Sequence, residues 1–371
     1  MSLALDSSAP FVDRIRSAVA TRLPLRIRGG GSKDFYAQAL EGELLHTTAL
    51  AGIVSYESSE LVVTAGAGTS LLELEALLAA HGQCLPFEPP HFAATSTSTV
   101  GGAVDSGLSG PARASVGGVR DYMLGVKIIN GKGEHLTFGG QVMKNVAGYD
   151  VSRLMAGSMG TLGLITEVSL KVLPVAPLEA TLRFECSQAQ ALQWLHAWGG
   201  QPLPLNASCW VEDNGVGTLY LRLRGAVAAV EAACKALGGE RLDNQTAAAD
   251  WQALRDQQLP WHQARSSTQD LWRLSLPQTT PVLNLPDSPL IEWHGGLRWL
   301  RAGAEQEPGL RAAAQAAGGH ATLFIACSPD TNCPIGRFDA LKPPLDRIHR
   351  ALKHEFDPAA IFNPHRMSAD W

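Results

Sequence analysis

The sequence has few cysteines, and none of them stands in the spacing of a metal centre. The six cysteines include no C-x-x-C pair, and the two nearest in sequence, Cys327 and Cys333, have five residues between them. Iron–sulfur clusters and structural zinc sites need thiolates at closer, repeated spacing. The pattern excludes a metal redox centre built on such motifs, and it fits free thiols in a reducing cytoplasm.

An excess of positive charge and long apolar runs are also lacking. The 30 Lys and Arg residues are outnumbered by 35 Asp and Glu, which gives a net charge of −5 and a pI near 6.1. This balance argues against a nucleic-acid binder. The opening residues, MSLALDSSAP, lack the apolar core of a secretory signal, and no run of about 18 apolar residues predicts a membrane-spanning helix.

Glycine and tryptophan are unevenly distributed along the chain. Of the 37 glycines, 23 fall within residues 1–175, whereas all nine tryptophans follow residue 190. The stretch 173–177, LPVAP, has two prolines and suits a linker. A chain of 371 residues is long enough for two domains, so we place a boundary near residue 175.

Hydrophobic periodicity predicts mixed helices and strands in both parts. In the first part the pattern predicts a helix over 11–21, a strand over 61–65, a helix opened by an S-x-x-E capping box at Ser70 and ended at Gly82, a hairpin at 130–133 and a half-buried strand over 164–172. In the second part it predicts a strand over 219–223, an alanine-rich helix up to 238–239 and a hairpin at 295–296. The second part therefore fits an antiparallel sheet with helices on one face.

The run RGGGSK at residues 28–33 is the most informative short motif. Glycines are costly to order, but they expose backbone N–H groups that can converge on an anion such as a pyrophosphate. An ordinary flexible loop is the alternative. The stretch GAGTSL at 66–71 resembles the start of a dinucleotide-binding fingerprint, but Leu71 stands where its third glycine is needed, so a plain strand-to-helix turn is favoured.

Three more glycine clusters follow in the same part of the chain. They are TVGGAVDSGLSGP at 99–111, GGVRD at 117–121 after Arg113, and GSMGTLGLITE at 157–167. Each alone fits a turn between strands. In this order they resemble the FAD-binding domain of flavoproteins of the vanillyl-alcohol oxidase and p-cresol methylhydroxylase type, over roughly residues 10–175.

Two further motifs narrow the resemblance. KNVAGYD at 144–150 and FDPAAIFNP at 356–364 are similar to the FAD-binding subunits of bacterial glycolate oxidases. The implied fold is α+β: a two-part FAD-binding domain over 1–175, an antiparallel-sheet α+β second (substrate, cap-like) domain over 176–335, and a C-terminal helix and tail over 336–371 that return to the FAD domain.

The resemblance also implies where non-covalent FAD is held. The glycine loop would face the pyrophosphate, the loop from Thr99 would clamp its other side, and Ile165 would cover the adenosine end. Neither His nor Cys occurs in or beside residues 28–33, so a covalent flavin is not expected. The cofactor-binding residues expected on this basis are Arg28, Gly29, Gly30, Gly31, Ser32, Lys33, Pro89, Thr99, Val100, Gly101, Gly102, Ser106, Gly107, Tyr149, Gly160, Thr161, Gly163 and Ile165.

Catalytic residues are harder to assign from the sequence. Related 2-hydroxyacid dehydrogenases carry histidine motifs in the second domain, whereas this chain has no H-x-H pair and no G-D-G-N-L-H segment. His320 is a candidate base, and Arg298, Arg301 and Arg337 are candidate ligands of a substrate carboxylate. A histidine at a turn and solvated surface arginines are the alternatives. His349 and His354 are five apart, which does not suit a shared metal, and we expect no metal site.

The implied function is the FAD-binding subunit of a glycolate oxidase complex, which oxidises glycolate or another small 2-hydroxy acid and passes electrons to a partner or a non-oxygen acceptor. A non-catalytic FAD subunit and a stand-alone flavin oxidoreductase for another small hydroxylated substrate remain alternatives. The resemblance implies a sister flavoprotein and an iron–sulfur subunit in the cytoplasm, with association at the inner face of the cell membrane through partners left open. At 365 the family usually has glycine after Asn-Pro, where this chain has His365.

Overall fold

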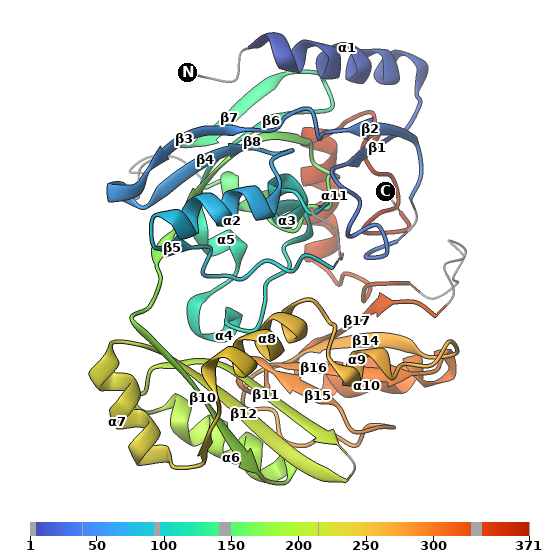
Figure 1. The fold of residues 1–371 in the computed structure, drawn as a ribbon. Coiled ribbons are helices and arrows are strands. Elements are labelled where there is room, and N and C mark those ends of the chain that lie inside the picture. Colours follow the sequence, from blue (N-terminus) through green and yellow to red (C-terminus); the bar gives the residue numbers. More distant parts are fainter. Residues whose placement is uncertain are drawn as a thin grey trace.

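The computed structural model describes residues 5–38, 40–92, 97–140, 150–213, 215–327 and 336–370. The chain forms two sheet-and-helix units, one above the other in Figure 1, and the predicted α+β class is confirmed. The N-terminal half makes the upper unit and residues from about 178 to 325 make the lower one. No described helix is both long and apolar enough to cross a membrane.

The upper unit is built around a five-stranded antiparallel sheet in the order β3-β4-β8-β6-β7. Two small sheets flank it: a parallel pair, β1 with β2, and an antiparallel pair, β5 with β9. The strands of this unit are β1 (Leu25–Arg28), β2 (Glu43–His46), β3 (Ile53–Glu57), β4 (Val62–Gly66), β5 (Gln83–Cys84), β6 (Met123–Ile129), β7 (His135–Gly139), β8 (Leu164–Lys171) and β9 (Leu173–Pro174).

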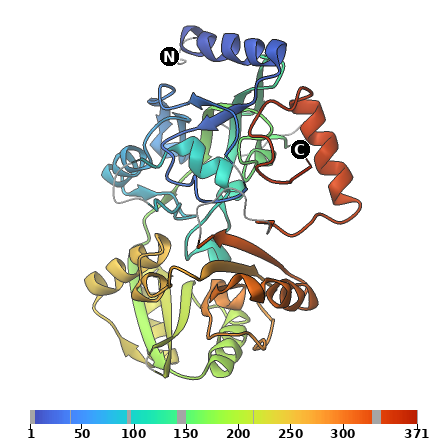
Figure 2. The same cartoon turned by 90° about the vertical axis from the view of Figure 1, so that its right-hand side faces the viewer.

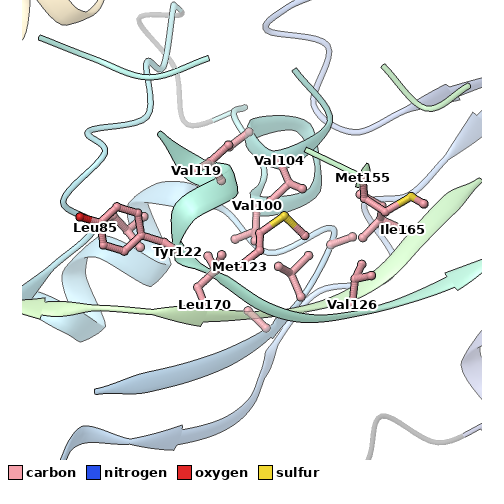
Figure 3. Packing of buried hydrophobic residues seen from close by; sticks show 14 of the residues in the cluster. Leu85, Val100, Val104, Val119, Tyr122, Met123, Val126, Met155, Ile165 and Leu170 are labelled. Carbon is pink, nitrogen blue, oxygen red and sulfur yellow. The ribbon is translucent and has the colours of Figure 1, made fainter. Parts of the chain in front are cut away.

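Helices α2, α3 and α5 pack on one face of this sheet and enclose the first core, whereas α1 belongs to a separate apolar cluster. Figure 3 shows the apolar side chains of α3 and α5 packed on β6 and β8, with Val100, Met123 and Ile165 among them. The packing removes this apolar surface from water, which is the main stabilising contribution to the unit. Its helices and 3-10 turns are α1 (Leu5–Thr21), η1 (Ser58–Glu60), α2 (Leu71–Ala80), α3 (Val100–Ser106), α4 (Arg113–Val116), α5 (Val119–Tyr122) and η2 (Ser152–Leu154).

The lower unit is an eight-stranded antiparallel sheet in the order β13-β10-β12-β11-β15-β16-β14-β17. Its strands are β10 (Leu178–Glu185), β11 (Leu205–Asp213), β12 (Val216–Gly225), β13 (Glu240–Arg241), β14 (Asp270–Ser275), β15 (Leu290–Glu292), β16 (Leu297–Ala302) and β17 (His320–Ile325). Its helices and 3-10 turns are α6 (Gln188–Gly199), α7 (Val227–Leu237), α8 (Asn244–Arg255), α9 (Pro260–Gln263), η3 (Trp293–Gly295), η4 (Ala304–Gln306) and α10 (Glu307–Ala316).

The two faces of this sheet differ in chemistry. Strand residues alternate between faces, so on β14 Trp272 and Leu274 join an outer apolar core with α10, whereas Leu271 and Arg273 point to the upper unit. We call these the outer and inner faces. The prediction of helices on one face was wrong, because α8 packs on the inner face while α6, α7 and α10 pack on the outer face. The inner face carries aromatic and charged side chains, as expected of a surface that lines a site.

The C-terminal helix α11 (Leu345–Phe356) returns to the upper unit, as Figure 2 shows. Its buried Lys353 donates to Asp357 at 2.7 Å, to Thr161 O at 2.8 Å and to Phe362 O at 2.9 Å. This ties the tail to the loop before β8 and to β1, where Phe362 bridges Leu25. The division at residues 175 and 335 stays a prediction.

Most local predictions are confirmed, with three corrections. The helix predicted over 11–21 begins at Leu5, with Pro10 inside it. α2 forms after Ser70, but its side chain makes no cap hydrogen bond. β8 is buried on both faces rather than half-buried, because cross-strand partners shield its polar side chains, as Thr64 does for Ser169. The strands, the alanine-rich helix and both hairpins form as predicted.

Candidate functional site

The glycine loop at residues 29–33 lines a cleft in the upper unit. It follows β1 and faces α3, and the space there is about 850 Å³ when its opening to solvent is included. We call this space the cleft. It collects most of the residues expected to bind the cofactor, from loops far apart in sequence. Those that line it are Arg28, Gly29, Gly30, Gly31, Ser32, Lys33, Thr99, Gly101, Gly102, Ser106 and Ile165.

Two glycines of the loop are required by contacts within the protein. A Cβ at Gly30 would lie 1.4 Å from Thr97 O, and one at Gly29 would lie 2.4 Å from Thr99 Oγ1. The Ser32 and Ser98 hydroxyls are 2.8 Å apart. The first two glycine-containing loops are therefore packed into one wall. Residue size at 29 and 30 is fixed by this packing, whether or not a ligand is bound.

Other expected residues lie behind the cleft and shape it. Val100 is buried in the core, and Thr161 donates to Ser158 O at 2.7 Å. Gly160 (φ 68°) lies against Asn363, whose Nδ2 would be 2.5 Å from an added Cβ. Pro89, Gly107 and Gly163 are likewise absent from the lining. Tyr149, and with it most of KNVAGYD, lies outside the described residues.

The charges of the cleft suit an extended anion. Arg26, Arg28, Lys33 and Arg366 line it, and Arg26 Nε is buried without a partner among the described residues. Burial lowers the pKa of Lys33 to about 8. The charge-assisted hydrogen bonds of a pyrophosphate would replace the hydrogen bonds to water that these cations lose on burial. The residues present therefore fit a dinucleotide such as FAD.

Three acids also line the cleft, Asp34, Glu41 and Asp105, and Asp34 pairs with Arg28 at 2.8 Å. Asp105 accepts hydrogen bonds from Ser158 Oγ at 2.8 Å and from the backbone N–H of Gly160 at 3.2 Å. Burial raises its pKa to about 7 despite these bonds. A carboxyl group that is partly neutral at pH 7 limits the repulsion of a bound anion and can hydrogen-bond to a hydroxyl.

The C-terminal tail completes the cleft. Asn363 accepts from Ile27 N at 2.8 Å and donates to Met159 O at 2.6 Å, so it joins β1 to the loop before β8. Arg366 donates to Gln38 O at 2.6 Å and holds the end of the loop. His365 has a φ of 58°, the left-handed conformation that favours glycine, and its exposed ring bonds to Ala369 O.

A second, smaller cavity lies where the two units meet. About 340 Å³ of space, which includes its opening to solvent, lies between residues near Pro90 and Gly110 and the inner face of the lower sheet. We call it the chamber. Its walls include Phe92, Arg273, Glu292, Trp293, Trp299 and Phe324. Tyr36 lines the cleft and packs on Phe324 with ring centroids 4.9 Å apart, and its hydroxyl is within hydrogen-bonding reach of Arg273.

The chamber contains a buried carboxyl group, that of Glu292, and the guanidinium group of Arg273. Glu292 is 5% exposed and accepts from Trp299 Nε1 at 2.6 Å. Burial raises its pKa to about 7, although the Trp299 hydrogen bond and the charge of Arg273 lower it. The guanidinium of Arg273 lies 5.0 Å from the Trp293 ring centroid and 6.0 Å from that of Trp299.

The candidate catalytic residues chosen from sequence are not brought together. His320 starts β17, is exposed, and is near enough to Arg273 for that charge to add to the burial that lowers its pKa. Arg298 is fully buried on the outer side and donates to Thr280 O at 2.6 Å. Arg337 lies near Arg366, and Arg301 lines an open cavity beside Trp261. Arg273 and Glu292, which sequence reasoning missed, occupy the chamber instead.

The missed residues gave weak sequence signals. Asp105 and Arg366 lie within or directly after motifs of the resemblance, so their positions were visible but their roles were not. Tyr36, Arg273 and Glu292 stand in no motif. Only the alternation of β14 and β15 would have placed Arg273 and Glu292 on the same face as Trp299.

Comparison with known proteins decides the family. Residues 3–139 match the family described as FAD binding domain. The chain is 44% identical over 365 residues to glycolate oxidase subunit GlcE of Escherichia coli strain K12, across 98% of each chain. This chain belongs to the GlcE family. Its FAD-binding domain and the resemblance stated from sequence are thereby confirmed.

More distant relatives of this GlcE-family chain cover shorter stretches. Glycolate oxidase subunit GlcD of Bacillus subtilis strain 168 is 34% identical over 126 residues, which are 34% of this chain and 27% of that protein. D-lactate dehydrogenase of Archaeoglobus fulgidus is 32% identical over 154 residues, 41% of this chain and 34% of that one. A solved structure of alkyldihydroxyacetonephosphate synthase shares the fold, with a TM-score of 0.66 at 17% identity over 96% of this chain and 74% of that chain.

Proposed function

We propose that this chain is the FAD-bearing subunit of a glycolate oxidase complex and takes part in oxidising a small 2-hydroxy acid. The observation that carries the proposal is the cleft, where glycine loops, four cations and the C-terminal tail converge in an FAD-binding domain. When bound, FAD supplies the two-electron redox chemistry. The names of the GlcE and GlcD relatives support a complex and a hydroxy-acid substrate.

The protein's own residues bind and orient the cofactor in this proposal. The backbone of residues 29–32 and the side chains of Arg26, Lys33 and Arg366 hold the pyrophosphate. Asp105 hydrogen-bonds to a hydroxyl of the cofactor. The described lining residues of the cleft include neither His nor Cys, which supports non-covalent binding.

A sister flavoprotein and an iron–sulfur subunit are the proposed partners. The proposal places the assembly in the cytoplasm, at the inner face of the cell membrane. The GlcE and GlcD names, which both denote subunits of glycolate oxidase, support the first partner. Co-purification with a tagged version of this chain tests both, and recovery of this chain alone from the native host would contradict them.

Position 102 offers a clean test of the cleft. Gly102 lines it, and an added Cβ would meet only Thr99 Oγ1, at 3.2 Å. Gly102→Asp puts a carboxylate beside the expected pyrophosphate and should weaken FAD binding by about 100-fold or more. Gly102→Ala should keep FAD, and so should Gly309→Asp, whose Cβ has nothing within 4 Å. Gly30 does not suit this test, because any side chain there strikes Thr97.

The readout is the absorption spectrum of the purified chain and a titration with FAD, repeated anaerobically with glycolate. Flavin bands that glycolate bleaches would support oxidation by the isolated chain. Bands that persist in the chain alone but bleach in the complex would assign the chemistry to the assembly. Equal FAD affinity in Gly102→Asp and wild type would overturn the cleft assignment.

A further inference from the structure

The arginines of the inner face differ in how they are neutralised. Arg222 is 3% exposed and donates to both carboxylate oxygens of Glu88, at 2.7 and 2.8 Å. Arg224 pairs with the same Glu88 and with Glu179. Arg273 lies on β14, next to the edge strand β17, and makes no ion pair with any described residue. One cation of this face therefore lacks the anion that its neighbours have.

The groups around Arg273 favour the binding of an anion. Arg113 lies 4.7 Å from the same Trp293 ring that Arg273 faces at 5.0 Å, and burial, together with the charge of Arg273, lowers the pKa of Arg113. The nearby acid, Glu292, is engaged by Trp299. The charge of Asp121 partly offsets that of Arg113, and Glu292, whose pKa is about 7, offsets that of Arg273 only in part. The remaining positive charge is costly where water is excluded.

We propose that the chamber is this chain's own binding site for a small 2-hydroxy acid, with Arg273 binding the carboxylate and Glu292 accepting the hydroxyl proton. The chamber is small, with about 340 Å³ of space that includes its opening to solvent, and this favours a ligand of few atoms. Arg273 presents its donors from a strand, with Tyr36 beside it. The inference rests on the proposed function, since the oxidant is the bound FAD.

The chemistry balances without another reagent. The O–H proton of the acid passes to a carboxylate oxygen of Glu292 while the carbon–oxygen double bond forms. The hydrogen on the same carbon would leave with its two electrons, for which FAD held in the cleft would be the acceptor, and the product would be a 2-oxo acid. Glu292 is suited to this task because burial holds its pKa near 7, where it can accept a proton and release it again.

Several groups set the charge that Glu292 experiences. Arg273 on β14 and Arg222 on β12 lower its pKa, while Glu88 raises it. The Cys209 thiol on β11 faces it as well, and burial keeps that thiol protonated by raising its pKa. Trp299 on β16 donates the hydrogen bond. Activity that depends on this acid should rise with pH through about 7, as the carboxylate form becomes populated.

Binding of oxalate, which cannot undergo the reaction, isolates the role of Arg273. We would measure its dissociation constant by tryptophan fluorescence on the FAD-loaded full chain, alone and within its complex. Arg273→Met should weaken binding by about 10-fold to 100-fold, the range expected for losing a charged hydrogen-bond donor. The dissociation constant of Arg273→Lys should lie between those of wild type and Arg273→Met. The control Arg301→Met changes another arginine of the inner face, in a different cavity, and should leave binding unchanged.

Glu292→Gln separates binding from proton transfer. Glutamine keeps the size of the side chain and an oxygen for Trp299. We expect oxalate to bind at least as tightly, and anaerobic bleaching by glycolate to slow by about 100-fold or more and lose its rise with pH near 7. Fluorescence and FAD content confirm that the variant is folded.

The outcomes distinguish this inference from the proposed function. Wild type that binds FAD but not oxalate, or Arg273→Met that binds oxalate as well as wild type does, overturns the chamber assignment and leaves the FAD assignment standing. Glu292→Gln that bleaches as fast as wild type overturns the role of Glu292. Loss of FAD from wild type itself would instead contradict the proposed function.

Discussion

The cleft, which Tyr36 lines, and the chamber, whose Phe324 packs against Tyr36, are built in different ways. The cleft is made by backbone loops and a returning tail, and its glycines at 29 and 30 allow segments far apart in sequence to touch. The chamber is made by side chains of one sheet face, where alternation places Arg273, Glu292 and Trp299 together. Loop motifs identify a cofactor site in sequence, whereas a substrate site built from strand alternation leaves no contiguous motif.

The two regions also handle charge differently. The cleft gathers four cations and three acids. Arg28 is paired with Asp34 and Asp105 has a pKa of about 7, so a net positive charge remains to attract an anion. The chamber is lined by Arg273, which has no ion pair with a described residue, by Arg255, which pairs with Asp256, and by one acid bound to Trp299, with Arg113 nearby. The difference suits a long polyanionic cofactor in one site and a small monoanion in the other. The following predictions test this contrast, from the largest expected effect to the smallest.

Glu88 joins the unit of the cleft to the sheet of the chamber, so its removal should have the largest effect. Burial alone would raise its pKa, but Arg222 and Arg224 together lower it. Glu88→Ala leaves buried Arg222 without its counter-ion and should cost about 3–5 kcal/mol of unfolding free energy, measured by urea titration. Glu231→Ala breaks the exposed pair with Arg241 and should cost no more than about 1 kcal/mol. Equal losses of unfolding free energy in the two variants would show that Glu88 does not hold the two units together.

Glu292 should make stability depend on pH in the chamber. Its folded-state pKa, about 7, is above the ordinary value of 4.5, so its contribution to stability is present below about pH 4.5 and is lost as pH rises to 7. The loss is on the order of 3 kcal/mol. Glu292→Gln should remove this component, which urea unfolding between pH 4.5 and 8 would reveal as a flatter profile. An unchanged profile would contradict a raised pKa.

The cleft should bind FAD less tightly as pH rises. Asp105, with a pKa of about 7, gains negative charge, and Lys33, with a pKa of about 8, loses positive charge. Both changes oppose an anion, so the dissociation constant should increase by about 10-fold between pH 6 and 9. Fluorescence titrations of FAD would measure it. Asp105→Asn should remove the part of the change near pH 7, and Lys33→Met the part near pH 8. A constant affinity of wild type across this range would refute the roles of both residues.

Tyr36 should show the smallest effect, and one that reports on the chamber. Tyr36→Phe removes the hydroxyl beside Arg273 and keeps the ring on Phe324, so it should cost about 1 kcal/mol of stability and weaken oxalate binding by about 3-fold to 10-fold. Tyr122→Phe removes a hydroxyl that donates to Val116 O at 2.7 Å in the core of the upper unit. It should cost a similar amount of stability and leave oxalate binding unchanged. If the two variants bind oxalate equally well, the Tyr36 hydroxyl has no role in the chamber.

Local sequence determined the elements and the first wall of the cleft. The Asn130 turn, the strand ending at Gly66 and the loops at 29–33 and 99–102 follow from short-range patterns, because turn chemistry and alternation act over a few residues. The same patterns predicted a capping hydrogen bond to the Ser70 side chain, which does not form. The buried hydroxyl of Ser70 has no partner among the described residues, because tertiary packing overrode the local signal.

By itself, the sequence determined the fold class, the cofactor and the loops that approach it, since these depend on motifs whose residues are neighbours in the chain. Only the tertiary structure decided which cations face the cleft, that Arg298 points away from the chamber while Arg273 points into it, and that Tyr36 stands between the two sites. The reason is physical. A residue's burial, its pKa and its partners depend on segments far away in the chain, as the bond from Ile27 to Asn363, 336 residues apart, illustrates.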